Sequence, residues 1–140
     1  MVQVIRLREE DLEQAVALEE EVFTHPWSRQ AIDDMIENEN VCFLVAKIGQ
    51  EVVGNCALRM ILGEGEITNV SVKEAYRGRG IAKEMLQELI KIGSKYGVKQ
   101  FTLEVRTKNV VAISLYEKLG FKKEGKRKNF YMDPIDDAWI

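Results

Sequence analysis

The chain has 140 residues, of which 46% are hydrophobic and 31% are charged, and its formal net charge at pH 7 is −3. That length and composition indicate one globular domain with a sizeable core, and they exclude a disordered chain. The weakly acidic balance excludes a protein that binds nucleic acid through a strongly basic face, and no apolar run reaches the roughly 18 residues of a membrane span.

The first half of the sequence predicts two helices between a short strand and a run of antiparallel strands. Ser28 precedes the second helix and has the side chain of an N-cap. Gly49-Gln50 separates two apolar runs and indicates a hairpin. The expected elements are a strand at 2–7, helices at 9–23 and 29–37, and strands at 41–48, 51–62 and 66–72.

The second half predicts two further helices, each followed by strand. Asn109 precedes the shorter helix as its cap, and Gly120 with Phe121 behind it ends that helix. The whole order of elements predicts one α+β domain over residues 1–140. The expected elements are a helix at 81–96, a strand at 101–106, a helix at 110–119, and strands around 130–131 and 138–140.

Arg77-Gly78-Arg79-Gly80, here called the glycine turn, lies between a predicted strand and a predicted helix. Glycine lets the backbone approach a ligand closely, and the start of a helix favours an anion. The turn lacks the third glycine or alanine of a dinucleotide fingerprint, where Lys83 stands, and it lacks the Gly-Lys-Ser/Thr of a Walker loop. It therefore predicts a phosphate site of another kind.

The glycine turn extends to Ala82 as R-x-x-G-x-A, a pattern that resembles the signature of the GCN5-related N-acetyltransferase (GNAT) family. The resemblance covers essentially the whole chain. It implies a GNAT-type α+β domain with a central mixed, mostly antiparallel twisted sheet of about seven strands, flanked by about four helices. Three more segments match in order, namely Asn69-Val70-Ser71-Val72, Leu103–Asn109 and Ala112–Phe121.

The resemblance implies that acetyl-CoA is the co-substrate and that no metal takes part. The amides of the turn would bind the pyrophosphate, and a bulge in the preceding strand would present backbone N–H groups to the acetyl carbonyl and the pantetheine arm. The residues that it implies for cofactor binding are Val70, Val72, Arg77, Gly78, Arg79, Gly80, Ile81, Ala82 and Asn109.

Two side chains carry the implied chemistry. Glu104 would remove the proton of the amine, directly or through a water, and Tyr116 would assist departure of the thiolate. From the residues alone, Glu104 also suits a solvated strand carboxylate and Tyr116 suits a core aromatic. Asn109 likewise suits a helix cap with no further role.

Within the family, the chain resembles the subgroup that acetylates the N-terminal alanine of a small-subunit ribosomal protein. The matching segments are Pro26-Trp27-Ser28, Leu103–Asn109, Asn129-Phe130-Tyr131 and Asp136-Asp137-Ala138. The resemblance implies a protein N-terminus as acceptor, in contact with Phe23, Pro26 and Tyr131. An α-amino group has a pKa of about 7.7–8.0 against about 10.4 for lysine, so it loses its proton more readily at neutral pH.

Other features receive plainer interpretations. Cys42 and Cys56 lie in apolar runs and predict buried packing rather than an acyl-enzyme nucleophile. His25 beside a proline receives no catalytic role, and no metal-ligand spacing occurs. The charged run 122–128 predicts a solvated hairpin, with contact to ribosomal RNA or to the CoA 3′-phosphate as the rival use.

We expect a cytoplasmic enzyme, monomeric or a weak dimer, with no membrane partner and no direct nucleic-acid partner. Three other functions remain open from the sequence. They are a lysine or small-amine acetyltransferase of the same fold, a non-catalytic module that binds acyl-CoA, and a ribosome- or RNA-associated interaction protein.

Overall fold

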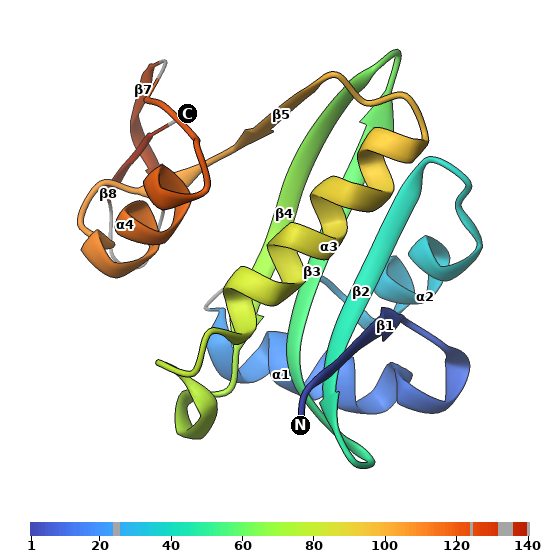
Figure 1. Ribbon diagram of the computed structural model, residues 1–140. Coiled ribbons are helices and arrows are strands. Elements are labelled where there is room, and N and C mark those ends of the chain that lie inside the picture. The colour runs from blue at the N-terminus through green and yellow to red at the C-terminus, as the bar shows by residue number, and fades with distance from the viewer. Residues whose placement is uncertain (24–25, 124, 132–135, 140) are drawn as a thin grey trace. The chain divides into compact units, whose positions relative to one another are not determined.

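The computed structural model describes every residue except 24–25, 124, 132–135 and 140 (Figure 1). For 126–131 and 136–139 the description is of the backbone. The chain groups into two compact units, Met1–Phe101 and Thr102–Ile140. A single domain over residues 1–140 stays a prediction.

The first unit contains three helices and most of one sheet. In chain order its elements are β1 (Gln3–Arg6), the 3₁₀ turn η1 (Glu9–Asp11), α1 (Leu12–Val22), α2 (Arg29–Glu37), β2 (Val41–Ile48), β3 (Glu51–Ile61), β4 (Glu64–Val72), the 3₁₀ turn η2 (Glu74–Tyr76) and α3 (Ile81–Lys95). Strand β5 (Gln100–Leu103) follows.

The sheet has the order β1-β2-β3-β4-β5, and the pairings β1·β2, β2·β3 and β3·β4 are antiparallel. The β2–β3 hairpin closes with Ile48 opposite Glu51, as its turn sequence predicts. Gly49 makes this tight turn possible, because its φ of +61° lies in the left-handed region that glycine adopts readily.

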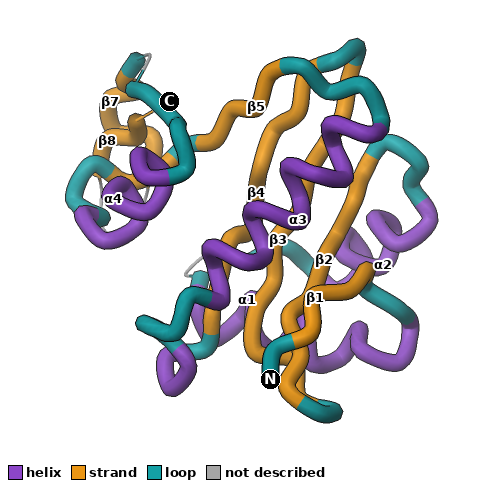
Figure 2. Tube along the Cα trace, in the orientation of Figure 1, coloured by secondary structure: helices purple, strands orange, loops and turns teal. Residues whose placement is uncertain are grey.

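The two faces of the sheet are buried by different helices. Leu12, Leu18 and Ile32 of α1 and α2 pack with Phe43 and Val45 in one core. Figure 2 shows α3 on the opposite face of the sheet. Its contact there is close, since a Cβ added at Gly54 of β3 would lie 2.9 Å from the Met85 side chain. The apolar periodicity of α3 is confirmed, as its buried residues include Ile81, Met85, Leu86 and Leu89.

The second unit contains β6 (Val105–Arg106), α4 (Val110–Lys118), β7 (Lys126–Tyr131) and β8 (Asp136–Trp139), with the antiparallel sheet order β6-β8-β7. The end of α4 follows its predicted chemistry. Gly120 has a φ of +101°, its N–H donates to the Glu117 carbonyl at 3.0 Å, and the Phe121 N–H donates to the Tyr116 carbonyl at 3.0 Å. This is the Schellman arrangement that closes a helix on glycine.

The predicted helices and caps are confirmed, and the α2 limits match. The predicted strand at 101–106 is wrong in one respect, because it breaks at Glu104. β5 belongs to the larger sheet, whereas Val105 and Arg106 pair with Trp139 and Ala138 of β8, so the chain changes partner at that residue. The described strands therefore number eight in two sheets, five and three, instead of about seven in one.

Smaller differences occur at element ends. The helix expected at 9–23 begins as the 3₁₀ turn η1, and β4 begins at Glu64 rather than at residue 66. The hairpin expected within 122–128 is also wrong, since residues from Lys126 onward form β7 and pair with β8. Ile140, the end of the last predicted strand, lies outside the described residues.

Candidate functional site

The glycine turn leads directly into the first turn of α3. Gly78 and Gly80 have φ values of +79° and +80°, and Gly80 is the N-cap whose carbonyl accepts the Glu84 N–H at 3.1 Å. A Cβ added at either glycine would meet nothing within 4 Å among the described residues. The N–H groups of the first helical turn have no partner within the helix itself. The turn therefore presents donors and a positive dipole end to open space, which suits a phosphate group.

Arg77 ties this turn to the end of β4. Its Nε donates a hydrogen bond of 3.0 Å to the Val72 carbonyl. Both arginines of the turn are exposed, and the Arg79 guanidinium carbon lies 5.1 Å from the centre of the Tyr76 ring. That stacking restrains the guanidinium while leaving its donors available to an anion.

Glu51 anchors the other side of the turn. Its carboxylate accepts hydrogen bonds from Lys73 at 2.9 Å and from the Tyr76 hydroxyl at 3.0 Å. These two hydrogen bonds lower the pKa of Glu51 below its ordinary value, and the bond from Lys73 has the larger effect. Sequence reasoning missed the roles of Glu51 and Tyr76. The pairing of residues 25 positions apart depends on the sheet, and no local pattern indicates it.

A β-bulge lies just before the glycine turn. In the β3·β4 register, Asn55 opposes Ser71 and Ala57 opposes Thr68, so Cys56 alone stands opposite the two residues Asn69 and Val70. Asn69 has a φ of +58°, a left-handed conformation that a non-glycine residue seldom adopts. Such bulges leave the extra residue outside the regular ladder and re-aim the strand. The bulge that the family resemblance implies at Val70 is therefore present.

A buried polar cluster of Glu19, Asn55 and Asn69, here called the Glu19 cluster, supports the bulge. Glu19 Oε2 accepts from Asn69 Nδ2 at 3.1 Å, and Glu19 Oε1 accepts from Asn55 Nδ2 at 3.4 Å. Asn55 Nδ2 also donates to the Ala15 carbonyl of α1 at 3.0 Å. Burial raises the pKa of Glu19 to about 7, although the Asn69 and Asn55 amides act to lower it. Sequence reasoning missed this cluster, because a glutamate in a helix ordinarily faces water.

The side chains of the other predicted cofactor residues of the first unit are buried or half-buried. Val72 and Ile81 are buried, whereas Val70 and Ala82 are half-buried. What these positions can offer a ligand is therefore their backbone N–H groups.

The second unit contains Glu104, Asn109 and Tyr116. Glu104 is half-buried at the junction of β5 and β6. Asn109 is the cap of α4, its Oδ1 accepting the Ala112 N–H at 3.2 Å. Tyr116 is buried, and its ring meets the edge of Phe121 with 6.1 Å between centroids. The cap and core-aromatic interpretations are thus confirmed, and the roles of these three residues in acetyl transfer stay predictions.

The predicted acceptor-side residues are described in part. Phe23 is half-buried directly after α1, and its N–H donates to the Glu19 carbonyl at 3.0 Å. Pro26 is exposed, and His25 lies outside the described residues. Tyr131 is the last residue of β7, and its side chain lies outside the description.

Both cysteines pack as predicted. Cys42 and Cys56 are free and buried, and burial raises the pKa of each thiol, so neither is a ready nucleophile. Among the described residues, no three His, Cys, Asp or Glu side chains gather where they could hold a metal ion. The helices of the described part of the chain are too short or too polar to cross a bilayer.

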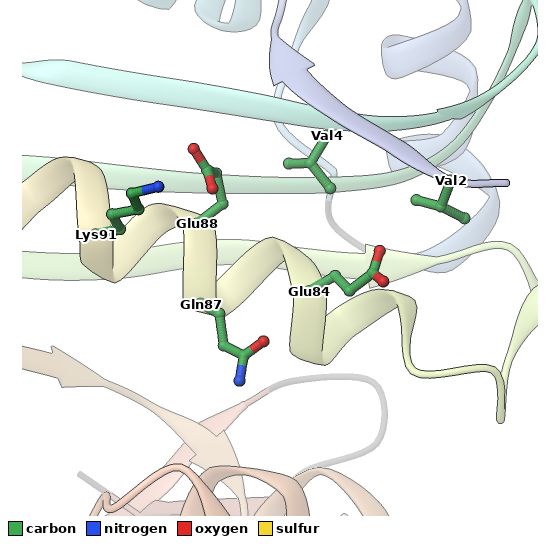
Figure 3. Close-up of a pocket in the computed structure, with 6 residues that line it drawn as sticks. All are labelled: Val2, Val4, Glu84, Gln87, Glu88 and Lys91. Carbon is green, nitrogen blue, oxygen red and sulfur yellow. The ribbon is translucent and has the colours of Figure 1, made fainter.

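A pocket of about 370 Å³ lies between β1 and α3 and holds none of the predicted site residues. Figure 3 shows Glu84 and Glu88 of α3 beside Val2 and Val4. The pocket lining has two carboxylates and one cationic side chain, Lys91, so the net negative charge makes it a poor match for a phosphate ligand.

Comparison with known proteins gives a family match and several similar chains. The model of the acetyltransferase (GNAT) family matches residues 12–121. The chain is 31% identical, over 132 residues, to the ribosomal protein bS18-alanine N-acetyltransferase of Escherichia coli strain K12. That match covers 93% of this chain and 88% of the relative.

Two crystal structures share the fold. The ribosomal-protein-S18-alanine N-acetyltransferase from Escherichia coli has a TM-score of 0.89 at 29% identity, covering 99% of this chain and 90% of that one. Arabidopsis thaliana NAA60 in complex with acetyl-CoA has a TM-score of 0.88 at 20% identity, covering 99% of this chain and 96% of that one.

Proposed function

The chain belongs to the acetyltransferase (GNAT) family, and we propose that it transfers the acetyl group of acetyl-CoA to a protein N-terminal amine. The proposed acceptor is the N-terminal alanine of a small-subunit ribosomal protein, and it is supported by the Escherichia coli relative, which is named a ribosomal protein bS18-alanine N-acetyltransferase. The observation that carries the proposal is the glycine turn, which opens α3 with two left-handed glycines, two arginines and free space in front of them.

In this proposal the glycine turn and the first amides of α3 bind the pyrophosphate of acetyl-CoA. The absence of side chains at Gly78 and Gly80 lets phosphate oxygens approach the backbone N–H groups. Arg77 and Arg79 add positive charge, and their contacts with the Val72 carbonyl and the Tyr76 ring limit their motion. The residues present therefore fit a diphosphate ligand.

Acetyl-CoA supplies a thioester that is activated toward amines. The proposed role of Glu104 is to accept the proton of the amine as its nitrogen bonds to the acetyl carbon. The Val70 N–H, at the bulge, would donate to the carbonyl oxygen where negative charge develops. As the carbon–sulfur bond breaks, Tyr116 would donate the phenol proton to the departing thiolate. The products are an acetylated amine and CoA, and proton exchange with solvent returns Glu104 to the carboxylate and Tyr116 to the phenol.

The proposed acceptor places modest demands on the base. An N-terminal amine has a pKa of about 7.7–8.0, so a sizeable fraction is already neutral near pH 7.5. Phe23 and Pro26, which follow α1, and Tyr131 of β7 are the proposed contacts of the acceptor peptide. Acetyl-CoA and newly made ribosomal proteins meet in the cytoplasm, which is the proposed location.

A peptide panel tests the proposal. The protein is incubated with acetyl-CoA and with peptides that differ in their first residue, alongside N-blocked peptides carrying a free lysine, and mass spectra are read. We expect one acetyl group on unblocked peptides, with alanine favoured at the first position. Acetylation confined to the blocked, lysine-bearing peptides would instead assign a lysine acetyltransferase. Binding of acetyl-CoA with no turnover on any amine would assign a binding module.

A further inference from the structure

Glu19 is the one buried carboxylate of the first unit, within the described residues, that faces amides rather than a cation. Its side chain has 0% exposure, whereas the buried Asp11 is paired with Lys47 at 2.8 Å. Burying an unpaired carboxylate is unfavourable, and an apolar residue in the same place would ordinarily be tolerated or stabilising. The acetyl-transfer chemistry described above makes no direct use of Glu19, so its burial requires another explanation.

The contacts of Glu19 lead to the bulge. Its Oε2 accepts from the Asn69 side chain at 3.1 Å, and Asn69 is the residue whose φ of +58° turns β4 out of register with β3. A left-handed conformation is unfavourable for most non-glycine residues, and asparagine adopts it more readily than they do. The hydrogen bond from the Asn69 side chain to Glu19 is placed to hold Asn69 in that conformation.

The last turn of α1, which contains Glu19, also leads to Phe23 and Pro26, the residues predicted to contact the acceptor. The Glu19 carbonyl accepts the Phe23 N–H at 3.0 Å, where α1 ends and the segment toward Pro26 begins. The Asn55 amide joins Glu19 to the Ala15 carbonyl, which fixes the carboxyl against α1. One buried side chain thus connects the end of α1 with the bulge of β4.

We propose that Glu19 is a positioning residue for acetyl transfer, which acts through Asn69 to hold the β4 bulge so that the Val70 N–H is aimed at the acetyl carbonyl. This inference rests on the proposed function, in which that N–H binds the acetyl oxygen. It does not depend on which amine accepts the acetyl group.

The first experiment measures binding of acetyl-CoA and of CoA by calorimetry, because the two ligands differ only at the acetyl group. Loss of one aimed hydrogen bond corresponds to about threefold to tenfold in affinity. For Glu19→Ala we expect acetyl-CoA to bind about threefold to tenfold more weakly and CoA to change less than about twofold. Glu19→Gln can still accept from one amide and donate to the buried Oδ1 of the other, so it should restore most of the acetyl-CoA affinity.

The matched control is Glu20→Gln, which changes an exposed carboxylate on the same helix and should leave both affinities unchanged. Equal weakening of acetyl-CoA and CoA by Glu19→Ala would overturn the proposal, because it would indicate a general structural defect. Unchanged acetyl-CoA affinity in a folded Glu19→Ala protein would overturn it as well.

A second test remains available should Glu19→Ala not fold. Asn69→Gly adopts a positive φ without help, whereas Asn69→Ala does not. We expect Asn69→Gly to retain kcat to within about threefold and Asn69→Ala to lower kcat about tenfold, with the Kd for CoA unchanged in both. A fall in kcat for Asn69→Gly as large as that for Asn69→Ala would contradict a role through backbone conformation.

These outcomes separate the inference from the proposed function. Wild-type protein that acetylates lysine instead of N-termini would overturn the proposed acceptor and leave the calorimetric prediction for Glu19 intact. Acetylation of N-termini with no selective effect of Glu19→Ala on acetyl-CoA would overturn the inference alone.

Discussion

The Tyr76 hydroxyl donates a hydrogen bond of 3.0 Å to the carboxylate of Glu51, and this contact joins the glycine turn region to the start of β3. Lys73 donates to the same carboxylate at 2.9 Å, and Arg79 stacks on the Tyr76 ring at 5.1 Å. The turn proposed to bind pyrophosphate is therefore held by Glu51, Lys73 and Tyr76, which lie outside it.

Tyr76→Phe should weaken CoA binding about twofold to fivefold while leaving kcat at saturating acetyl-CoA unchanged. The ring under Arg79 remains, but the hydroxyl bond to Glu51 is lost and the turn is less restrained. Calorimetry with CoA measures the change. Tyr96→Phe is the matched control, because the Tyr96 hydroxyl also takes part in a hydrogen bond, accepting from Arg6 at 3.4 Å, and an arginine likewise lies over its ring. Tyr96 is the C-cap of α3, at the end of the helix opposite to the turn. Equal weakening by both variants would contradict the prediction.

Gly80→Ala should reduce both stability and CoA affinity. An alanine at a φ of +80° is strained by roughly 1–2 kcal/mol, and its methyl group would project into the space proposed for phosphate. Thermal unfolding and calorimetry measure the two effects. Gly49→Ala carries a similar strain, at a φ of +61° with equally open surroundings, but it lies in the β2–β3 hairpin. Only the first variant should lose CoA affinity, and a loss in both would refute phosphate binding at this turn.

Glu104→Gln and Tyr116→Phe should each lower kcat by about tenfold or more, as expected for removal of a group that transfers a proton. Tyr116→Phe keeps the ring that packs on Phe121, so its melting temperature should be close to that of the wild type. Steady-state kinetics with thermal unfolding measure both quantities. Turnover within about twofold of wild type for both variants would show that the assigned roles are wrong.

Stability should fall as pH rises through the titration of Glu19. Its pKa is about 7 in the folded protein against an ordinary 4.5, so between these values the folded state binds the extra proton. The free energy of unfolding therefore decreases with rising pH in that window, by up to about 3 kcal/mol from this group, and levels off above pH 7. Urea unfolding at several pH values measures the slope.

Glu19→Gln, which cannot ionise, should remove this part of the pH dependence and gain stability over wild type more at pH 8 than at pH 5. Glu20→Gln should leave the slope unchanged, since that carboxylate is exposed. A wild-type slope retained in Glu19→Gln would place the titration elsewhere.

Local chemistry made much of the fold predictable from the sequence. The predicted limits of helix α2 are confirmed, from its N-cap Ser28 to its last residue. They were predictable because the cap and the apolar spacing involve residues that are close together in the sequence. The Gly120 end of α4 was predictable for the same reason. The break at Glu104 was not, since it depends on Val105 pairing with Trp139, far along the chain.

The site was predictable where residues act through short motifs and unpredictable where they act through the sheet. The glycine turn and its left-handed glycines follow from local sequence, as does the cap Asn109. The contact between Glu19 and Asn69 joins residues 50 positions apart. A glutamate does not indicate burial, and an asparagine permits a positive φ without requiring one. Such polar contacts require the register of β3 against β4, which periodicity alone does not provide.

The central claim, acetyl transfer from acetyl-CoA to an N-terminal amine, is tested most directly on one peptide that carries both a free N-terminal alanine and an internal lysine. Fragment mass spectra after incubation with the protein and acetyl-CoA locate the added acetyl group. The proposed function predicts acetylation on the first residue, with loss of the signal in Glu104→Gln. Acetyl groups on the lysine with an unmodified N-terminus would contradict it.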